Sequence, residues 1–133
     1  MGGDHRAHSC PRLAALARGK NIDLIFLLAP NSSQNRIKAV SKASTGFIYL
    51  MSITGITGVR KRFSASAKKT ISKIRKFTDK PIAIGFGISN PAQAKEAAKI
   101  GDGVIVGSAI VKEAAKSIKG AARLVKSLKK AIS

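Results

Sequence analysis

Four short apolar runs, each followed by a stretch with helical spacing, limit what this chain can fold into more than any other feature. We expect strands at residues 23–29, 47–51, 81–84 and 103–106. The uninterrupted apolar run from Leu24 to Ala29 predicts a strand that is buried on both faces. Because each interval between strands holds one helix, the strands must run parallel and be joined by crossover helices. The sequence therefore predicts the α/β class.

The intervals between these runs carry apolar residues three or four positions apart, as one face of a helix requires. Asn31, Ser32 and Ser33 are candidate N-caps, and Pro91 suits the first turn of a helix. Residues 1–11 mix Gly, His, Ser and Pro and predict an unstructured tail, so that 12–133 form one domain with a C-terminal amphipathic helix. Four β/α units fit either a small open doubly wound sheet or half of a (β/α)8 barrel.

The charge of the chain is extreme for an ordinary enzyme. It holds 25 Lys and Arg against 6 Asp and Glu, a formal net charge of +19 over 133 residues, and a polyanion is a plausible companion. The single Cys10 excludes an intrachain disulfide, so we expect a reducing, cytoplasmic location. No apolar run is long enough to cross a bilayer, and we expect no transmembrane segment. Aromatic residues are scarce, which weakens any interpretation that relies on stacking of nucleic-acid bases.

Glycine-rich motifs follow three of the expected strands, at 54–58, 85–89 and 107–110. Glycine lets backbone N–H groups approach an anion, and a helix that begins just after Ser108 would add its N-terminal partial charge. A glycine at a strand end is often only a turn residue, but three in series favour a phosphate site. Neither a Walker motif nor a dinucleotide fingerprint is present, since Asn90 stands where a third glycine would be. Nucleotide binding is therefore disfavoured.

These motifs, taken in order, resemble the tryptophan synthase alpha subunit from about residue 13 to 133. The resemblance is carried by Asp23-Leu-Ile-Phe-Leu-Leu-Ala-Pro30, Gly46-Phe-Ile-Tyr-Leu-Met-Ser52 with Thr54-Gly-Ile-Thr-Gly58, Pro81-Ile-Ala-Ile-Gly-Phe-Gly-Ile-Ser89 and Asp102-Gly-Val-Ile-Val-Gly-Ser-Ala-Ile-Val111. It implies a (β/α)8 barrel of which this chain has strands five to eight only. The family cleaves indole-3-glycerol phosphate to indole and glyceraldehyde 3-phosphate in tryptophan biosynthesis, and passes the indole to a beta subunit.

The resemblance also implies roles for residues at the strand ends. Those expected at the phosphate of indole-3-glycerol phosphate, or of another phosphorylated small molecule, are Gly58, Gly87, Gly107 and Ser108. Those expected to line the indole or glycerol end are Tyr49, Thr57, Phe86 and Ile105. The segment 53–63 resembles the family's mobile sixth loop, although its basic Arg60-Lys61-Arg62 departs from the pattern.

The acid and base that this cleavage needs are expected to be absent from the chain. In the family, two carboxyl groups do this work, and they belong to the half that the resemblance does not cover. None of the six acidic residues follows an expected strand. We therefore expect no catalytic residue here and no activity of the chain alone. The segment before Leu13 lacks the family's fourth strand, so the chain looks truncated and given a foreign start.

Metal and cofactor sites are not expected. His5, His8 and Cys10 could ligate Zn²⁺, but three ligands in a tail without a fourth favour an accidental cluster.

Two further partners remain open from the sequence. An open half-barrel leaves two strand edges and an apolar inner face exposed, so a homodimer that closes the barrel is expected. The other is a polyanion: residues 60–80 hold nine Lys or Arg and 112–130 hold seven. Solvated outer faces of helices are the simpler explanation of these charges. The alternative function is a basic, non-catalytic module that binds nucleic acid or another polyanion, including an anionic membrane surface.

Overall fold

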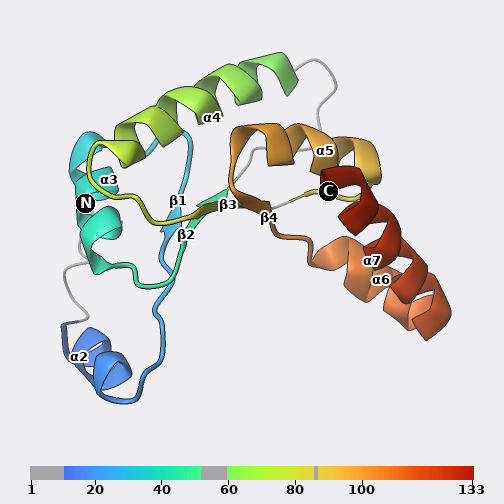
Figure 1. Cartoon of the computed structure of the whole chain (residues 1–133), viewed down its shortest axis with the longest axis horizontal. Helices are drawn as coiled ribbons and strands as arrows, with labels where there is room; N and C mark the ends of the chain where they lie inside the picture. The colour runs from blue at the N-terminus through green and yellow to red at the C-terminus, as the bar shows by residue number, and fades with distance from the viewer. Residues whose placement is uncertain (1–10, 52–59, 86) are drawn as a thin grey trace.

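The computed structural model describes residues 11–51, 60–85 and 87–133, and it confirms the α/β class and the half-barrel. Its four parallel strands lie in one sheet in chain order (Figure 1). They are β1 (Leu27–Leu28), β2 (Ile48–Met51), β3 (Ile82–Gly85) and β4 (Gly103–Val104). A doubly wound sheet reverses its strand order at a switch point, whereas a barrel segment keeps it. The order β1-β2-β3-β4 is thus that of a barrel segment.

Six helices flank the described strands. They are α2 (Pro11–Gly19), α3 (Gln34–Ala43), α4 (Arg60–Arg75), α5 (Pro91–Ile100), α6 (Ser108–Lys116) and α7 (Ile118–Ile132). In Figure 1 the molecule forms an arch, with α2 at one foot, α6 and α7 at the other, and the sheet and α4 across the top. Among the described helices none has the length and apolarity that a membrane span requires.

The core lies between the sheet and its helices. Leu28, Leu50, Ile84 and Val104 form one row across the four strands, and the first three are almost completely buried. Ile37 and Val40 of α3, Ala67 and Ile74 of α4, and Ala94 of α5 cover this face from the helix side. This face is therefore packed on β1, β2 and β3, and Val104 of β4 is partly buried against the same core.

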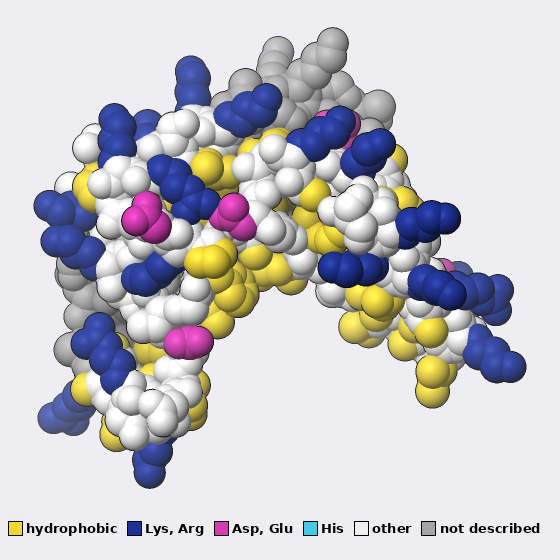
Figure 2. All heavy atoms as spheres, in the orientation of Figure 1, with side chains coloured by type: hydrophobic (Ala, Val, Ile, Leu, Met, Phe, Trp, Pro, Cys, Tyr) yellow, Lys and Arg dark blue, Asp and Glu magenta, His cyan; other side chains and the backbone are white. Residues whose placement is uncertain are grey.

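The opposite face of the sheet is only partly buried, which corrects the expectation for the first strand. Leu27 is 43% exposed, and Tyr49 and Ala83, its neighbours across the sheet, are partly exposed. Apolar side chains gather along the hollow underside of the arch in Figure 2. The apolar run at 24–29 signals a parallel strand, but burial of its second face needs further strands across the barrel interior.

The first strand is also shorter than predicted, because side chains satisfy part of its backbone. The N–H of Leu24 donates to Thr45 Oγ1 at 2.7 Å, and that of Phe26 donates to Ser44 Oγ at 3.4 Å. These hydroxyls replace ladder partners, so regular pairing with β2 is confined to Leu27 and Leu28. The last strand ends at Val104 instead of the expected 106.

The start of α3 follows a predicted cap, Ser33, and the start of α5 follows the prediction for Pro91, with Asn90 as a cap that was not predicted. Ser33 Oγ accepts from the Arg36 N–H, and Asn90 Oδ1 accepts from the Gln93 N–H with Pro91 in the first turn of α5. One boundary differs: residues 60–63, expected in a loop, are the first residues of α4. No Gly or Pro interrupts this segment of the sequence, so a helix can extend through it. Of the expected tail, residues 1–10 lie outside the described part of the chain, and Pro11 begins α2.

Candidate functional site

The carboxyl ends of β3 and β4 bring together three of the predicted phosphate residues. Gly87 follows β3 by two residues, and Gly107 and Ser108 lie between β4 and the first turn of α6. Because β3 and β4 are neighbouring parallel strands, these segments leave the sheet at the same end of the strands. Gly58 and the rest of segment 52–59, which follows β2, lie outside the described residues.

The start of α6 is open to an approaching ligand. Gly107 is the N-cap residue, and no side chain there accepts a hydrogen bond from the first turn. Its carbonyl accepts from the N–H groups of Ile110 and Val111, both at 3.0 Å, which fixes the turn. Gly107 and Ser108 are exposed, and a Cβ atom added at Gly107 would meet no atom within 4 Å. The positive end of the helix dipole therefore faces free space.

The loop after β3 is held by a network at the start of α5. Gln93 Oε1 accepts from the N–H and the hydroxyl of Ser89, at 2.8 and 3.0 Å, while Asn90 Oδ1 accepts from the Gln93 N–H at 2.9 Å. Gly87 has a φ of +79°, a conformation that favours glycine. The network and the glycine together give the backbone after β3 one defined course.

Two of the residues predicted at the indole end, Tyr49 and Ile105, belong to β2 and to the segment after β4. Leu27, Tyr49, Ala83 and Gly103 are neighbours across the four strands on the inner face of the sheet. Ile105 donates its N–H to Ile84 O at 2.8 Å and continues the line of β4. Tyr49 and Ile105 are both half-buried. Thr57 and Phe86, the other two residues predicted here, lie outside the described residues.

The sequence interpretation missed Gly85 as a site residue. A Cβ atom on Gly85 would lie 2.4 Å from Tyr49 Oη and 2.7 Å from Tyr49 Cζ. The tyrosine ring thus lies over Gly85 of β3, which is buried and has no side chain. The Gly85-Phe86-Gly87 motif was the sequence signal for this position. Only the register between β2 and β3, however, places Gly85 beside Tyr49.

The described acidic residues lie away from the carboxyl ends of the strands. Asp79 and Asp102 precede β3 and β4, Asp23 precedes β1, and Glu96 and Glu113 are on α5 and α6. In a parallel sheet the residues that precede the strands and those that follow them lie at opposite ends of the strands. The three described aspartates therefore lie at the opposite end of the strands from Gly87 and Gly107, and the two glutamates lie on helices.

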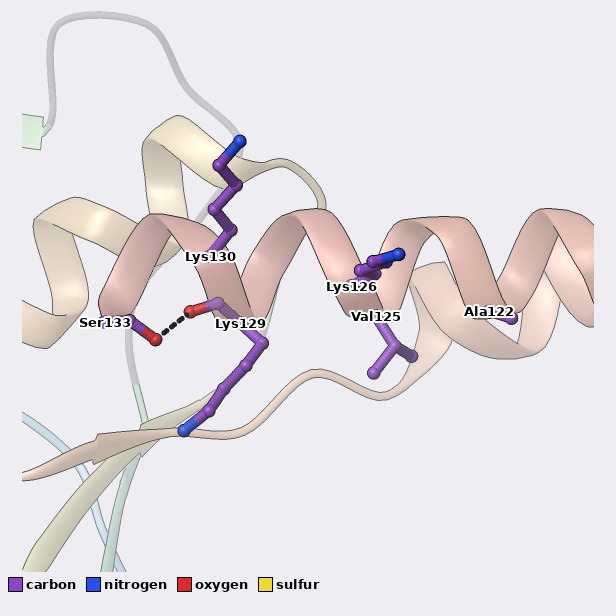
Figure 3. Close-up of a pocket in the computed structure, with 6 residues that line it drawn as sticks. All are labelled: Ala122, Val125, Lys126, Lys129, Lys130 and Ser133. Atoms are coloured by element: carbon purple, nitrogen blue, oxygen red, sulfur yellow. Dashed lines mark hydrogen bonds between the residues drawn. The ribbon is translucent and has the colours of Figure 1, made fainter.

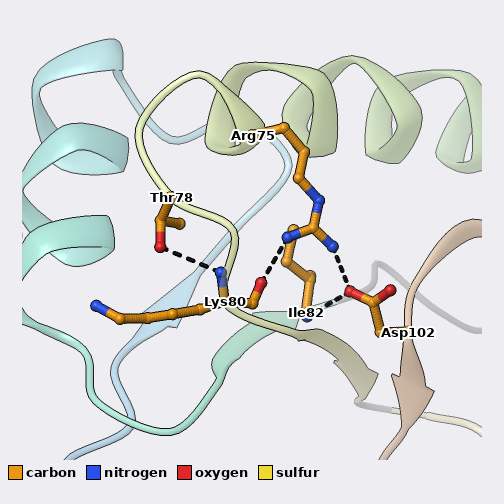
Figure 4. A network of polar contacts seen from close by, with 5 residues as sticks. All are labelled: Arg75, Thr78, Lys80, Ile82 and Asp102. Carbon is orange, nitrogen blue, oxygen red and sulfur yellow. Dashed lines mark hydrogen bonds and ion pairs between the residues drawn. The ribbon is translucent and has the colours of Figure 1, made fainter.

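Asp102 has a structural role at the amino end of the strands, directly before β4 (Figure 4). Its Oδ2 accepts from the N–H of Ile82 at 2.9 Å and forms an ion pair with Arg75, which also donates to the Lys80 carbonyl. The Ile82 N–H, together with the hydrogen bond and charge of Arg75, lowers the pKa of the Asp102 carboxyl below its ordinary value, against the opposing effect of partial burial. The group joins α4, β3 and β4.

No cluster of three or more His, Cys, Asp and Glu side chains that could hold a metal occurs in the described part of the chain. His5, His8 and Cys10 lie outside it.

Comparison with known proteins points to one family. The model of the family described as "Tryptophan synthase alpha chain" matches residues 5–133, so it does not support the interpretation of residues 5–11 as foreign to that family. The chain is 52% identical over 100 residues to the tryptophan synthase alpha chain of Picosynechococcus sp., covering 74% of this chain and 38% of that protein. It is 47% identical over 123 residues to that of Synechococcus elongatus, covering 91% of this chain and 46% of the relative.

Solved structures give the same answer for the fold. The alpha subunit of tryptophan synthase from Campylobacter jejuni matches with a TM-score of 0.80 and 35% identity, covering 88% of this chain and 48% of that one. A Mycobacterium tuberculosis tryptophan synthase structure matches with a TM-score of 0.79 and 34% identity over 92% of this chain. The chain thus spans less than half the length of these relatives.

Proposed function

Because the chain belongs to the tryptophan synthase alpha chain family, we propose that it forms the phosphate-binding half of a site for indole-3-glycerol phosphate. Gly58, Gly87, Gly107 and Ser108 hold the phosphate, and Tyr49, Thr57, Phe86 and Ile105 line the indole and glycerol end. The observation that carries this proposal is the open start of α6. There the exposed Gly107 and Ser108 lie at the same end of the parallel strands as Gly87.

Phosphate is held here by the backbone and the helix dipole. The N–H groups of the first turn of α6 point out of its N-terminus, where their partial positive charge favours an anion. The absence of a side chain at Gly107 lets a phosphate oxygen come within hydrogen-bond distance of them. Tyr49, which lies across Gly85, offers an aromatic face on the inner side of the sheet for the indole ring.

Cleavage of the substrate needs groups that this chain does not bring to the site. A retro-aldol reaction requires an acid to protonate the indole ring carbon and a base to take the glycerol hydroxyl proton. The described carboxylates lie at the amino end of the strands or on helices. Lysine and arginine are poor substitutes, because they are protonated at neutral pH. The chain alone therefore binds without cleaving, and the acid and base come from a complementary half-barrel.

The family resemblance extends this proposal to a beta subunit, which would receive the indole, and to a cytoplasmic place in tryptophan biosynthesis. A second candidate function, binding of nucleic acid or another polyanion, is favoured by one observation. Figure 2 shows lysines and arginines spread over the outer surface, with few acidic side chains among them. Affinity for DNA or RNA that falls steeply with added salt, while phosphate fails to bind at Gly107, would favour that function.

A titration with glycerol 3-phosphate followed by amide NMR tests the site. We expect the largest shifts in the N–H groups of residues 107–111 and 87–89, with weak affinity, since one half of the pocket is present. Gly107→Val places a side chain in the free space before α6 and should abolish these shifts without disturbing the core. Shifts confined to lysine-rich helices and unchanged in Gly107→Val would reject the assignment.

A further inference from the structure

One outer surface of the molecule is built from a stretch of chain without acidic residues. Residues 24–78 hold eleven Lys and Arg but neither Asp nor Glu. Within this stretch α3 packs against α4, and both cover the face of the sheet opposite Tyr49 (Figure 1). Acidic residues return only with Asp79, after α4 ends, and Glu96 on α5. We call the exposed lysines of this helix pair the basic face: Lys38, Lys42, Lys68, Lys69, Lys73 and, directly after α4, Lys76.

The charges of the basic face do not stabilise the helices that carry them. Lys38 and Lys42 are four residues apart and so lie on the same side of α3, where like charges are unfavourable, and the same spacing recurs on α4. Neither helix contains an acidic residue to complement its dipole. Of the described residues only Arg75 and Asp102 form an ion pair. A solvated helix surface ordinarily carries both signs, whereas this surface is complementary to an external polyanion.

The surroundings of the basic face indicate which polyanion fits. A helix that lies on a membrane buries exposed apolar side chains beside its cations, but the described parts of α3, α4 and α5 have no exposed large apolar side chain. Proteins that hold single-stranded nucleic acid stack its bases on aromatic rings, and no aromatic residue lies on α3 or on α4 from residue 67 onward. Lysines without either kind of neighbour suit a regular array of phosphates, such as the backbone of a double helix.

The size of the basic face also suits a duplex. From Lys69 to Lys73 the helix rises about 6 Å, and packed helices such as α3 and α4 lie about 8–10 Å apart. A double helix carries one charge per about 1.7 Å of its axis, so a patch of these dimensions faces several phosphates at once. Lysine is a flexible point charge that can follow a phosphate but reads no base edge.

We propose that the basic face binds the phosphate backbone of a nucleic-acid duplex without reading its sequence. This inference rests on the second candidate function, for which it names the polyanion and the surface that holds it. It needs neither Gly107 nor the inner face of the sheet, so phosphate binding at the start of α6 and duplex binding at α3 and α4 can be lost separately.

The test is binding of the purified chain to fluorescent duplexes of about two helical turns, followed by anisotropy between about 50 and 200 mM salt. We expect two DNA duplexes of unrelated sequence to bind equally, and an RNA duplex measured beside them shows which backbone is preferred. A variant that neutralises four lysines of the basic face should bind about tenfold or more weakly, with a salt slope lowered by about two to four. This variant is Lys38→Gln/Lys42→Gln/Lys69→Gln/Lys73→Gln.

A matched control removes the same charge from exposed lysines of α7, three of which are drawn in Figure 3. This control is Lys119→Gln/Lys126→Gln/Lys129→Gln/Lys130→Gln. It should leave the salt slope unchanged and weaken binding far less than the variant of the basic face. Gly107→Val should bind the duplex as the unchanged chain does, which separates this interaction from the proposed phosphate site. Circular dichroism verifies that all variants fold.

Three results would overturn the proposal. One is the absence of binding to either duplex at the lowest salt. Another is equal weakening by the two quadruple variants, which would reduce the effect to overall charge. The third is tighter binding to phosphatidylserine vesicles or to a single strand than to the duplex, lost in the variant of the basic face, since that result would assign the lysines to a different ligand.

Discussion

Gly85 shows at the scale of single residues how a position without a side chain can shape a site. Tyr49 crosses β3 above Gly85, with its hydroxyl 2.4 Å from where a Cβ atom would stand. Gly85 is buried, whereas the Tyr49 ring that covers it is partly exposed. The sequence predicts Tyr49 as a lining residue and glycine at 85, but their contact depends on strand register, which no local pattern specifies.

Gly85→Ala should destabilise the chain by about 1–3 kcal/mol, because overpacking at a buried position forces the ring and backbone to shift. Urea denaturation measures this loss, and a double-mutant cycle identifies its cause. In a Tyr49→Ala background the same change should cost almost nothing, because the clashing ring is gone. An equal cost in both backgrounds would mean that Tyr49 is not what Gly85 accommodates.

At the scale of elements, local signals were enough for the helices but not for the outer strands. Ser33 caps α3 and Pro91 lies in the first turn of α5, as predicted, and apolar spacing places α3, α5 and α7 correctly. The strands β1 and β4 are shorter than their apolar runs, because ladder length depends on neighbours and competing side chains such as Thr45. The link from α4 through Arg75 to Asp102 joins segments that are 27 residues apart, and sequence spacing gives no sign of it.

Asp102→Ala should lower stability at neutral pH by about 1 kcal/mol, because the Ile82 N–H and Arg75 lose their shared acceptor. The folded pKa of Asp102 is lowered, so its contribution is fully present above the unfolded value of about 3.9. It disappears as the pH falls through the lower folded value. Urea unfolding of both proteins from neutral to acid pH should therefore show the difference shrinking below about pH 4.

Asp79→Ala is the matched control for this pH series, since it removes an exposed carboxyl that precedes β3 as Asp102 precedes β4. Its effect on stability should be small. A difference between the wild-type chain and Asp102→Ala that grows as the pH falls would contradict the assigned role of the carboxylate.

At the scale of the whole molecule, the chain is a set of parallel β/α units with one packed face and one open face. The α/β class and the parallel strand direction could be predicted from the serial alternation of strands and helices, whereas the order of the strands in the sheet could not, because that alternation also fits a doubly wound sheet. The exposure of the inner face was expected only from the resemblance to half of a barrel, because an apolar run looks the same whether or not a further strand covers it.

The central claim is that this chain holds the phosphate half of an alpha-chain site and lacks its acid and base. Indole release from indole-3-glycerol phosphate by the purified chain tests it most directly. We predict no release above the blank for the chain alone, and release when a complementary N-terminal half docks beside it, reduced by Gly107→Val in that complex. Indole formation by the chain alone, lost in Gly107→Val so that contamination is excluded, would contradict the account and place the catalytic groups within these 133 residues.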